Sequence, residues 1–151
     1  MIKNIAHVGL TVSDINRSID FYQNTLGLKF KGQMVMEGES TDALFGLKNC
    51  SVKVAYLNGS NHIMTPPVEL IQFASTDTTI FKNSLTQTSI SELCFYVKNI
   101  DKVYEDLISK GVEFLSTPQY FDFTNQGFGK SKAVYFKDPD GIILELMECM
   151  Y

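Results

Sequence analysis

An internal repeat is the feature that most limits how this chain of 151 residues can fold. Residues 6–15, AHVGLTVSDI, have a counterpart in residues 91–100, SELCFYVKNI. Residues 68–71, VELI, have a counterpart in residues 144–147, LELM. Two segments that recur in the same order indicate two copies of one small supersecondary unit, which predicts a pseudo-symmetric fold.

Each copy carries an ionisable side chain at the same two positions. These are His7 and Glu69 in the first copy and Glu92 and Glu145 in the second. Imidazole and carboxylate groups are common ligands of divalent metal ions. A repeat that places them at equivalent points predicts one metal site built between the two halves of the fold.

The first unit, residues 1–74, has the pattern of a βαβββ module. Its helix begins at a capping residue, either Ser13 or Asp14, and ends at Gly27. Residues 41–46 form a short helical turn, and residues 58–61, NGSN, form a turn between strands. Strands rich in β-branched and alternating apolar residues are predicted at 5–12, 28–37, 51–57 and 68–74.

The second unit, residues 90–151, repeats this order. Its helix begins at a cap on Asn99, has apolar residues at helical spacing and ends at Gly111. The segment between the units, residues 75–89, is polar and rich in Ser and Thr, so we predict a linker there. Strands are predicted at 90–97, 112–120, 133–137 and 142–148. The expected fold class is α+β, with two tandem βαβββ modules forming a curved mixed sheet.

Alternation along the strands predicts which way the ionisable residues face. Val8, Leu10 and Val12 share the face that covers the helix, so His7 points to the opposite face. The same argument turns Glu92 away from the second helix. Glu69 and Glu145 each stand between residues of the apolar face, so all four side chains are expected on the concave side of the sheet.

Composition favours a small molecule as the binding partner. The net charge is -4 and no basic cluster occurs, which argues against nucleic acid and anionic membranes. The sequence contains no signal peptide and no apolar run of membrane-spanning length, so we expect a cytoplasmic protein. Cys50, Cys94 and Cys149 form no CxxC pair and are expected to be reduced thiols, with Cys94 in the core. His62, beside a turn, is expected to be an ordinary surface histidine.

Four segments along the chain match the motifs of a known family. They are HVGLTVSD at 7–14, Phe21-Tyr22 followed by Leu26-Gly27, VEL at 68–70, and YFKDPDGIILEL at 135–146. In these segments the chain resembles the vicinal oxygen chelate superfamily, which includes glyoxalase I, methylmalonyl-CoA epimerase, extradiol dioxygenases and bleomycin resistance proteins. The resemblance covers nearly the whole chain and implies two βαβββ modules, often completed as a homodimer, with a divalent metal ion in the hollow of the sheet.

The resemblance implies that His7, Glu69, Glu92 and Glu145 are the metal ligands. Glu92 departs from the pattern, because glyoxalase I and the epimerase usually have His there. This Glu counts against an extradiol dioxygenase, whose iron site needs two His and one carboxylate. The implied ion is Ni, Zn, Mn, Co or Fe(II). Other roles stay open: His7 as a hydrogen-bonded core residue, Glu92 as a solvated residue or a partner of Lys.

The activity implied is that of a glyoxalase-like lyase or isomerase, which removes a proton next to a carbonyl while the metal stabilises an enediolate. Glu145 or Glu69 is then the base. One alternative is an acyl-CoA epimerase, with Lys130, Lys132 and Lys137 holding phosphates. Another is a non-catalytic drug-binding or resistance protein, with aromatic side chains lining the hollow. The sequence leaves open the substrate, a role for glutathione or CoA, and whether the site lies within one chain or across a dimer. The aromatic residues are Phe45, Phe121, Phe123 and Phe128.

Overall fold

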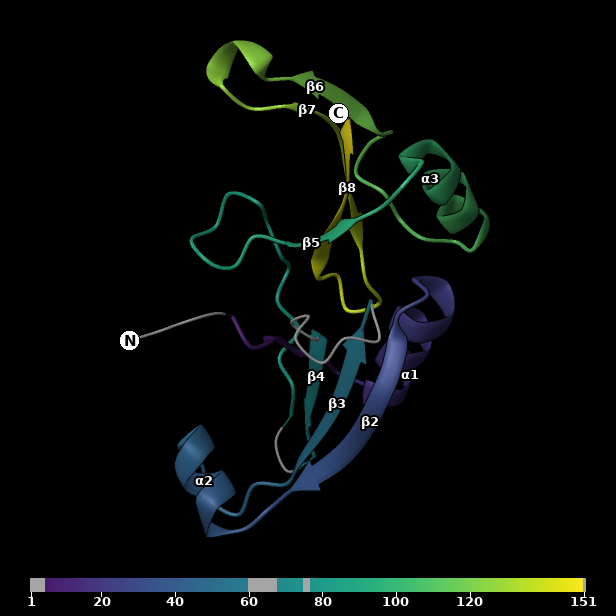
Figure 1. The fold of residues 1–151 in the computed structure, drawn as a ribbon. Coiled ribbons are helices and arrows are strands. Elements are labelled where there is room, and N and C mark those ends of the chain that lie inside the picture. Colours follow the sequence, from purple (N-terminus) through teal and green to yellow (C-terminus); the bar gives the residue numbers. More distant parts are fainter. Residues whose placement is uncertain (1–4, 60–67, 75–76, 151) are drawn as a thin grey trace. The chain divides into compact units, whose positions relative to one another are not determined.

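The computed structural model describes residues 5–59, 68–74 and 77–150. The chain divides into two compact units, Met1–Ile80 and Phe81–Tyr151, and the division falls inside the predicted linker. Figure 1 shows the first unit from purple to teal and the second from teal to yellow. The end of the predicted turn at 58–61 and His62 lie outside the described residues. No helix in the described ranges is long and apolar enough to cross a membrane.

The first unit is a four-stranded mixed sheet with the strand order β1-β4-β3-β2. β1 runs parallel to β4, and the other neighbours are antiparallel. A π-helical turn, η1 (Phe21–Thr25), extends the first helix. The elements are β1 (Val8–Thr11), α1 (Ile15–Asp20), β2 (Lys29–Met36), α2 (Glu39–Phe45), β3 (Val52–Asn58) and β4 (Val68–Phe73).

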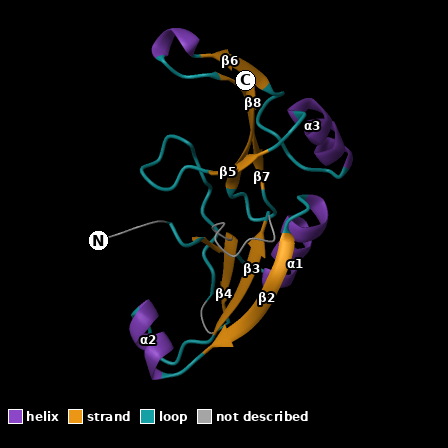
Figure 2. Cartoon of the chain, viewed as in Figure 1, coloured by secondary structure: helices purple, strands orange, loops and turns teal. Residues whose placement is uncertain are grey.

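The second unit repeats this topology with the strand order β5-β8-β7-β6, and β5 is parallel to β8. The prediction of two tandem βαβββ modules is therefore confirmed (Figure 2). The elements are β5 (Leu93–Tyr96), α3 (Ile100–Ser109), β6 (Gln119–Asp122), the 3-10 turn η2 (Thr124–Gln126), β7 (Lys130–Lys137) and β8 (Ile143–Met150).

The first sheet has an apolar layer on each face. On one face α1 packs against β3 and β4 and covers the main core. On the other face a smaller cluster is formed by Cys50, Val52 and Val54, and Phe45 of α2 packs against it. Phe45 also stacks edge-on against Phe73, with ring centroids 5.3 Å apart. Phe45, predicted to line a hollow, is thus part of this cluster. Residues of the main core are Leu10, Val12, Ile15, Tyr22, Leu57 and Leu70.

The predicted strand at 112–120 is wrong over most of its length. Only its last two residues belong to β6, and upstream of them Phe114 makes a single bridge with Phe136. The ring of Phe114 instead packs between Tyr104 and Phe136, with centroids 4.7 and 5.4 Å away. The apolar alternation here reflects packing against α3, and Pro118 has no N–H to continue a ladder.

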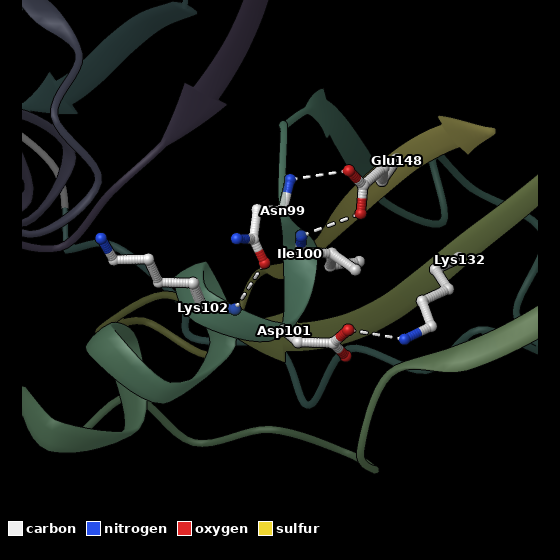
Figure 3. Close-up of polar contacts among 6 residues, drawn as sticks. All are labelled: Asn99, Ile100, Asp101, Lys102, Lys132 and Glu148. Atoms are coloured by element: carbon white, nitrogen blue, oxygen red, sulfur yellow. Dashed lines mark hydrogen bonds and ion pairs between the residues drawn. The ribbon is translucent and has the colours of Figure 1, made fainter. Parts of the chain in front are cut away.

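In each module a side chain on the last strand accepts hydrogen bonds from backbone N–H groups at the start of the helix. The Glu148 carboxylate of β8 accepts hydrogen bonds from the backbone N–H groups of Asn99, at 2.7 Å, and Ile100, at 3.0 Å (Figure 3). The Asn99 side chain caps α3 by accepting from the Lys102 N–H. In the first module the Gln72 amide accepts from the Ile15 N–H at 3.0 Å. Each contact satisfies donors that a helix N-terminus leaves free.

The hydrogen bonds of Glu148 should make the folding stability of the protein fall in acid, and we expect the substitution Glu148→Gln to remove this part of the pH dependence. The two backbone N–H donors hold the pKa of Glu148 below its usual 4.5. Because the folded pKa is lowered, this stabilisation is complete above pH 4.5 and disappears as the pH falls through the folded pKa. In Glu148→Gln the side chain is an amide, which does not titrate. The amide of Gln72 plays the same part in the first module. Thermal melts between pH 3 and 6 should fall less steeply for the variant, and parallel curves would contradict the prediction.

Candidate functional site

One cluster of candidate site residues lies around Glu69 in the first unit, on the sheet face opposite α1. The strand registers place Tyr56 of β3 and Gly9 of β1 on either side of Glu69. The Tyr56 hydroxyl donates to Glu69 Oε1 at 2.7 Å. His7 Nε2 lies 3.0 Å from Glu69 Oε2. The Glu69 side chain is only 12% exposed, against 44% for His7, so these two partners replace most of the water around the carboxylate.

Gly9 provides the room that this carboxylate occupies. A Cβ atom at Gly9 would lie 3.3 Å from Glu69 Oε2 and 3.2 Å from Ile71 Cδ1, closer than most Cβ contacts in proteins. The absence of a side chain at Gly9 therefore allows Glu69 Oε2 to lie over the β1 backbone and to reach His7.

Tyr56 is held as a hydrogen-bond donor. Its hydrogen bond to Glu69, its partial burial and the negative charge of Glu69 raise its pKa to about 12. All three causes disfavour the phenolate. The hydroxyl therefore keeps its proton at neutral pH and remains available to the carboxylate.

The second unit has a corresponding cluster that is built from different side chains. The registers place Cys94 and Tyr135 on either side of Glu145, where the first half has Gly9 and Tyr56. The pKa of Cys94 is raised to about 12 by partial removal of the thiol from water, then by its hydrogen bond to Glu145 and by nearby negative charge, including that of Glu92. Partial burial and the charges of Glu145 and Glu92 also raise the pKa of Tyr135.

The prediction that Cys94 lies in the core is wrong. Cys94 is exposed, and Cys50 is the buried cysteine. Strand alternation explains this result, because Leu93 and Phe95 share the face of β5 that is turned toward α3, which leaves Cys94 on the side of Glu92 and Glu145.

The structure groups the four predicted ligands as two per unit. His7 and Glu69 are in contact in the first unit. Glu92 and Glu145 both act on Cys94 and Tyr135 in the second. Within either unit, no three described His, Cys, Asp or Glu side chains are grouped as a metal site.

The donor atoms present in the first unit fit a divalent ion. An imidazole nitrogen and a carboxylate oxygen are both regular ligands of such ions. Their separation of 3.0 Å also matches neighbouring ligands of one octahedral ion, because bonds of about 2.1 Å at right angles span about 3 Å. The same separation suits a hydrogen bond between the two side chains when no ion is bound.

Sequence reasoning missed Tyr56, Gly9 and the contact of Cys94 with Glu145. In both copies of the repeat a tyrosine on the neighbouring strand stands opposite the repeated glutamate. Tyr56 is opposite Glu69, and Tyr135 is opposite Glu145. The spacing along the chain differs between the copies, so the sequence comparison alone did not align the two tyrosines.

A cavity of about 250 Å³ lies in the first unit. Thr11 and Phe73, on β1 and β4, line it from the sheet face that also carries Glu69. Its lining combines two apolar side chains with three threonines and one carboxylate, which suits an uncharged or cationic group of a small molecule. The remaining lining residues are Leu47, Asp77, Thr78 and Thr79.

The chain belongs to the Glyoxalase/Bleomycin resistance protein/Dioxygenase superfamily, whose family model matches residues 4–146. This superfamily includes many enzymes, and its members commonly use a divalent metal ion.

Among curated proteins, the chain is similar to the uncharacterized protein YraH of Bacillus subtilis strain 168, with 26% identity over 148 residues, 97% of this chain and 98% of YraH. A glyoxalase family protein from Bacillus cereus has 21% identity and a TM-score of 0.83, with 100% of this chain and 97% of that chain covered. The trypanothione-dependent glyoxalase I of Leishmania major has 18% identity and a TM-score of 0.69, with 97% and 87% covered. These structural likenesses establish the fold.

Proposed function

We propose that this protein is a metal-dependent lyase or isomerase resembling glyoxalase I, with His7, Glu69, Glu92 and Glu145 as the metal ligands. The observation that carries the proposal is the pairing of His7 Nε2 with Glu69 Oε2 at 3.0 Å, on a sheet face turned away from the helix. The second module supports it by placing Glu145 at the equivalent point of its own sheet. The substrate is a small molecule with a carbonyl next to an acidic C–H bond, and the working form is a homodimer.

A bound divalent ion supplies Lewis-acid stabilisation of negative charge on neighbouring substrate oxygens. The proton is removed by a carboxylate of the chain and returned to the adjacent carbon, as in general acid–base catalysis. Both oxygens of Glu69 have partners, Tyr56 and His7. Glu145 instead lies in register beside Cys94, whose thiol is a weak donor. Glu145 is therefore the more available base.

The charges on the second module argue against the acyl-CoA epimerase. Binding of CoA phosphates requires free cations, and the three candidate lysines all have carboxylate partners. Lys132 Nζ lies 2.6 Å from Asp101, Lys137 Nζ 2.7 Å from Glu113, and Lys130 Nζ 3.4 Å from Asp122. Each phosphate contact would have to compete with an existing ion pair.

Metal analysis tests the proposal. We expect purified protein to contain about one divalent ion per chain, and a chelator to lower the melting temperature. Adding back Ni, Mn, Zn, Co or Fe(II) should raise it by about 5 to 10 °C at saturation, since an ion at a hundredfold its dissociation constant adds about 2.7 kcal/mol.

A pair of variants provides the control for this measurement. His7→Ala should lose the rise in melting temperature, and Glu39→Gln, an exposed substitution in α2, should keep it. Assays on hemithioacetals would follow with the preferred ion. Protein that neither contains metal nor responds to any of the five ions would contradict the proposal and direct attention to a drug-binding function, with screening of hydrophobic ligands.

A further inference from the structure

The two modules differ in how a tyrosine contacts their glutamate. Tyr56 and Tyr135 occupy equivalent places, each paired in register with the glutamate of its module. Tyr56 donates a hydrogen bond of 2.7 Å to Glu69. Between the described side chains of Tyr135 and Glu145 there is no such bond, and on β5 the residue in register with Glu145 is Cys94 rather than a glycine. The two modules therefore share their topology but differ in whether the tyrosine donates a hydrogen bond to the glutamate.

The Tyr56 hydrogen bond fixes the orientation of the Glu69 carboxylate, so that its second oxygen faces His7. With Oε1 held by the hydroxyl, Oε2 lies over Gly9 and 3.0 Å from His7 Nε2. Because the Glu69 side chain is only 12% exposed, water cannot readily replace the hydroxyl if the carboxylate turns. A short side chain at Gly9 would also press on Oε2, so the carboxylate is located from both sides.

We propose that Tyr56 is a positioning residue that holds Glu69 Oε2 beside His7 for metal binding. This inference rests on the proposed metal-dependent function. Tyr56 also lies edge-on to the His7 ring, with ring centroids 6.3 Å apart, and it would not itself bind the ion. Its role is that of the outer hydrogen-bond partners that orient carboxylate ligands in metal sites.

The experiment compares Tyr56→Phe with Tyr135→Phe, which removes the equivalent hydroxyl of the other module. Co²⁺ alone is the probe, added to metal-free protein, with the dissociation constant measured by calorimetry. Loss of an outer partner costs about 10- to 100-fold in metal affinity, so we expect a loss in this range for Tyr56→Phe. Tyr135→Phe removes a hydroxyl that, between the described side chains, makes no hydrogen bond to Glu145, so it should lower the Co²⁺ affinity less than Tyr56→Phe does. The Co²⁺ absorption spectrum should change only in Tyr56→Phe.

A double-substitution cycle distinguishes positioning from a general structural effect. If Tyr56 acts through Glu69, Tyr56→Phe should have little further effect on Co²⁺ affinity in a Glu69→Gln background. Gly9→Ala is an independent variant, in case Tyr56→Phe does not fold. It displaces Oε2 without touching the tyrosine and should also weaken Co²⁺ binding.

The possible failures are separate. Wild-type protein that binds none of the five ions would overturn the proposed function and the role of Tyr56 with it. If the wild type binds Co²⁺ but Tyr56→Phe and Tyr135→Phe have equal affinities, only the positioning role is overturned. Unchanged Co²⁺ affinity in Gly9→Ala would likewise show that the location of Glu69 Oε2 does not matter for metal binding.

Discussion

Glu145→Gln is expected to reduce turnover by about 100- to 10,000-fold, the usual contribution of a general acid or base. The amide keeps the shape of the side chain and can still face Cys94, but it cannot accept a proton at neutral pH. Because Glu145 stands on β8 between the buried residues Leu144 and Leu146, the backbone at this position is well supported. The melting temperature should therefore change by only a few degrees.

This prediction is checked by measuring turnover of the substrate found in the assays above, together with a melting curve on the same preparation. Glu113→Gln is the matched control, because Glu113 lies on the surface and pairs only with Lys137 in the second module. The control should retain wild-type activity. Full turnover in Glu145→Gln would remove Glu145 from the mechanism, and Glu69 would then be the remaining candidate base.

Phe136→Ala is expected to cost about 3 to 5 kcal/mol of folding stability, the range found when a buried aromatic ring is replaced by a methyl group. Phe136 is fully buried in the core of the second module. Its ring lies against Phe114, whose own ring contacts Tyr104 of α3, so the cavity would open between the sheet and the helix. For a chain of this length, such a loss should lower the melting temperature by about 10 to 15 °C.

Urea denaturation measures the free energy directly, and the comparison variant is Ile108→Ala. Ile108 lies on α3 near the same core but is 47% exposed, so its loss should cost much less than that of Phe136. A Phe136→Ala protein as stable as Ile108→Ala would mean that the stack of Phe114, Tyr104 and Phe136 contributes little to the second module.

The fold could be predicted because its main signals are local. Alternation identified the strands, and the repeat indicated two modules. Caps predicted at Ser13 or Asp14 and at Asn99 marked the helix starts, and the structure has Asp14 and Asn99 in these places. The segment at 112–120 failed because alternating apolar residues can pack against a helix without pairing as a strand. Local patterns contain no information that separates these two outcomes.

The candidate site was predictable only in part. The contact of His7 with Glu69 joins residues 62 positions apart, and the repeat indicated it because both belong to matching motifs. Tyr56 belongs to no motif, and its contact with Glu69 depends on the register of β3 against β4. Register is set by the whole sheet, so a residue placed by register alone escapes a motif search.

The environment of Cys94 has a consequence for the chemical reactivity of the protein. Oxidants and alkylating reagents attack the thiolate, and partial burial together with the neighbouring carboxylates holds the pKa of Cys94 well above its usual range. The thiol is therefore less reactive than an ordinary surface cysteine, in part because of the carboxylates beside it. The rate at which a thiol reagent modifies Cys94 thus depends on Glu145 and Glu92, so this cysteine can serve as a chemical probe of the candidate site residues in the second unit.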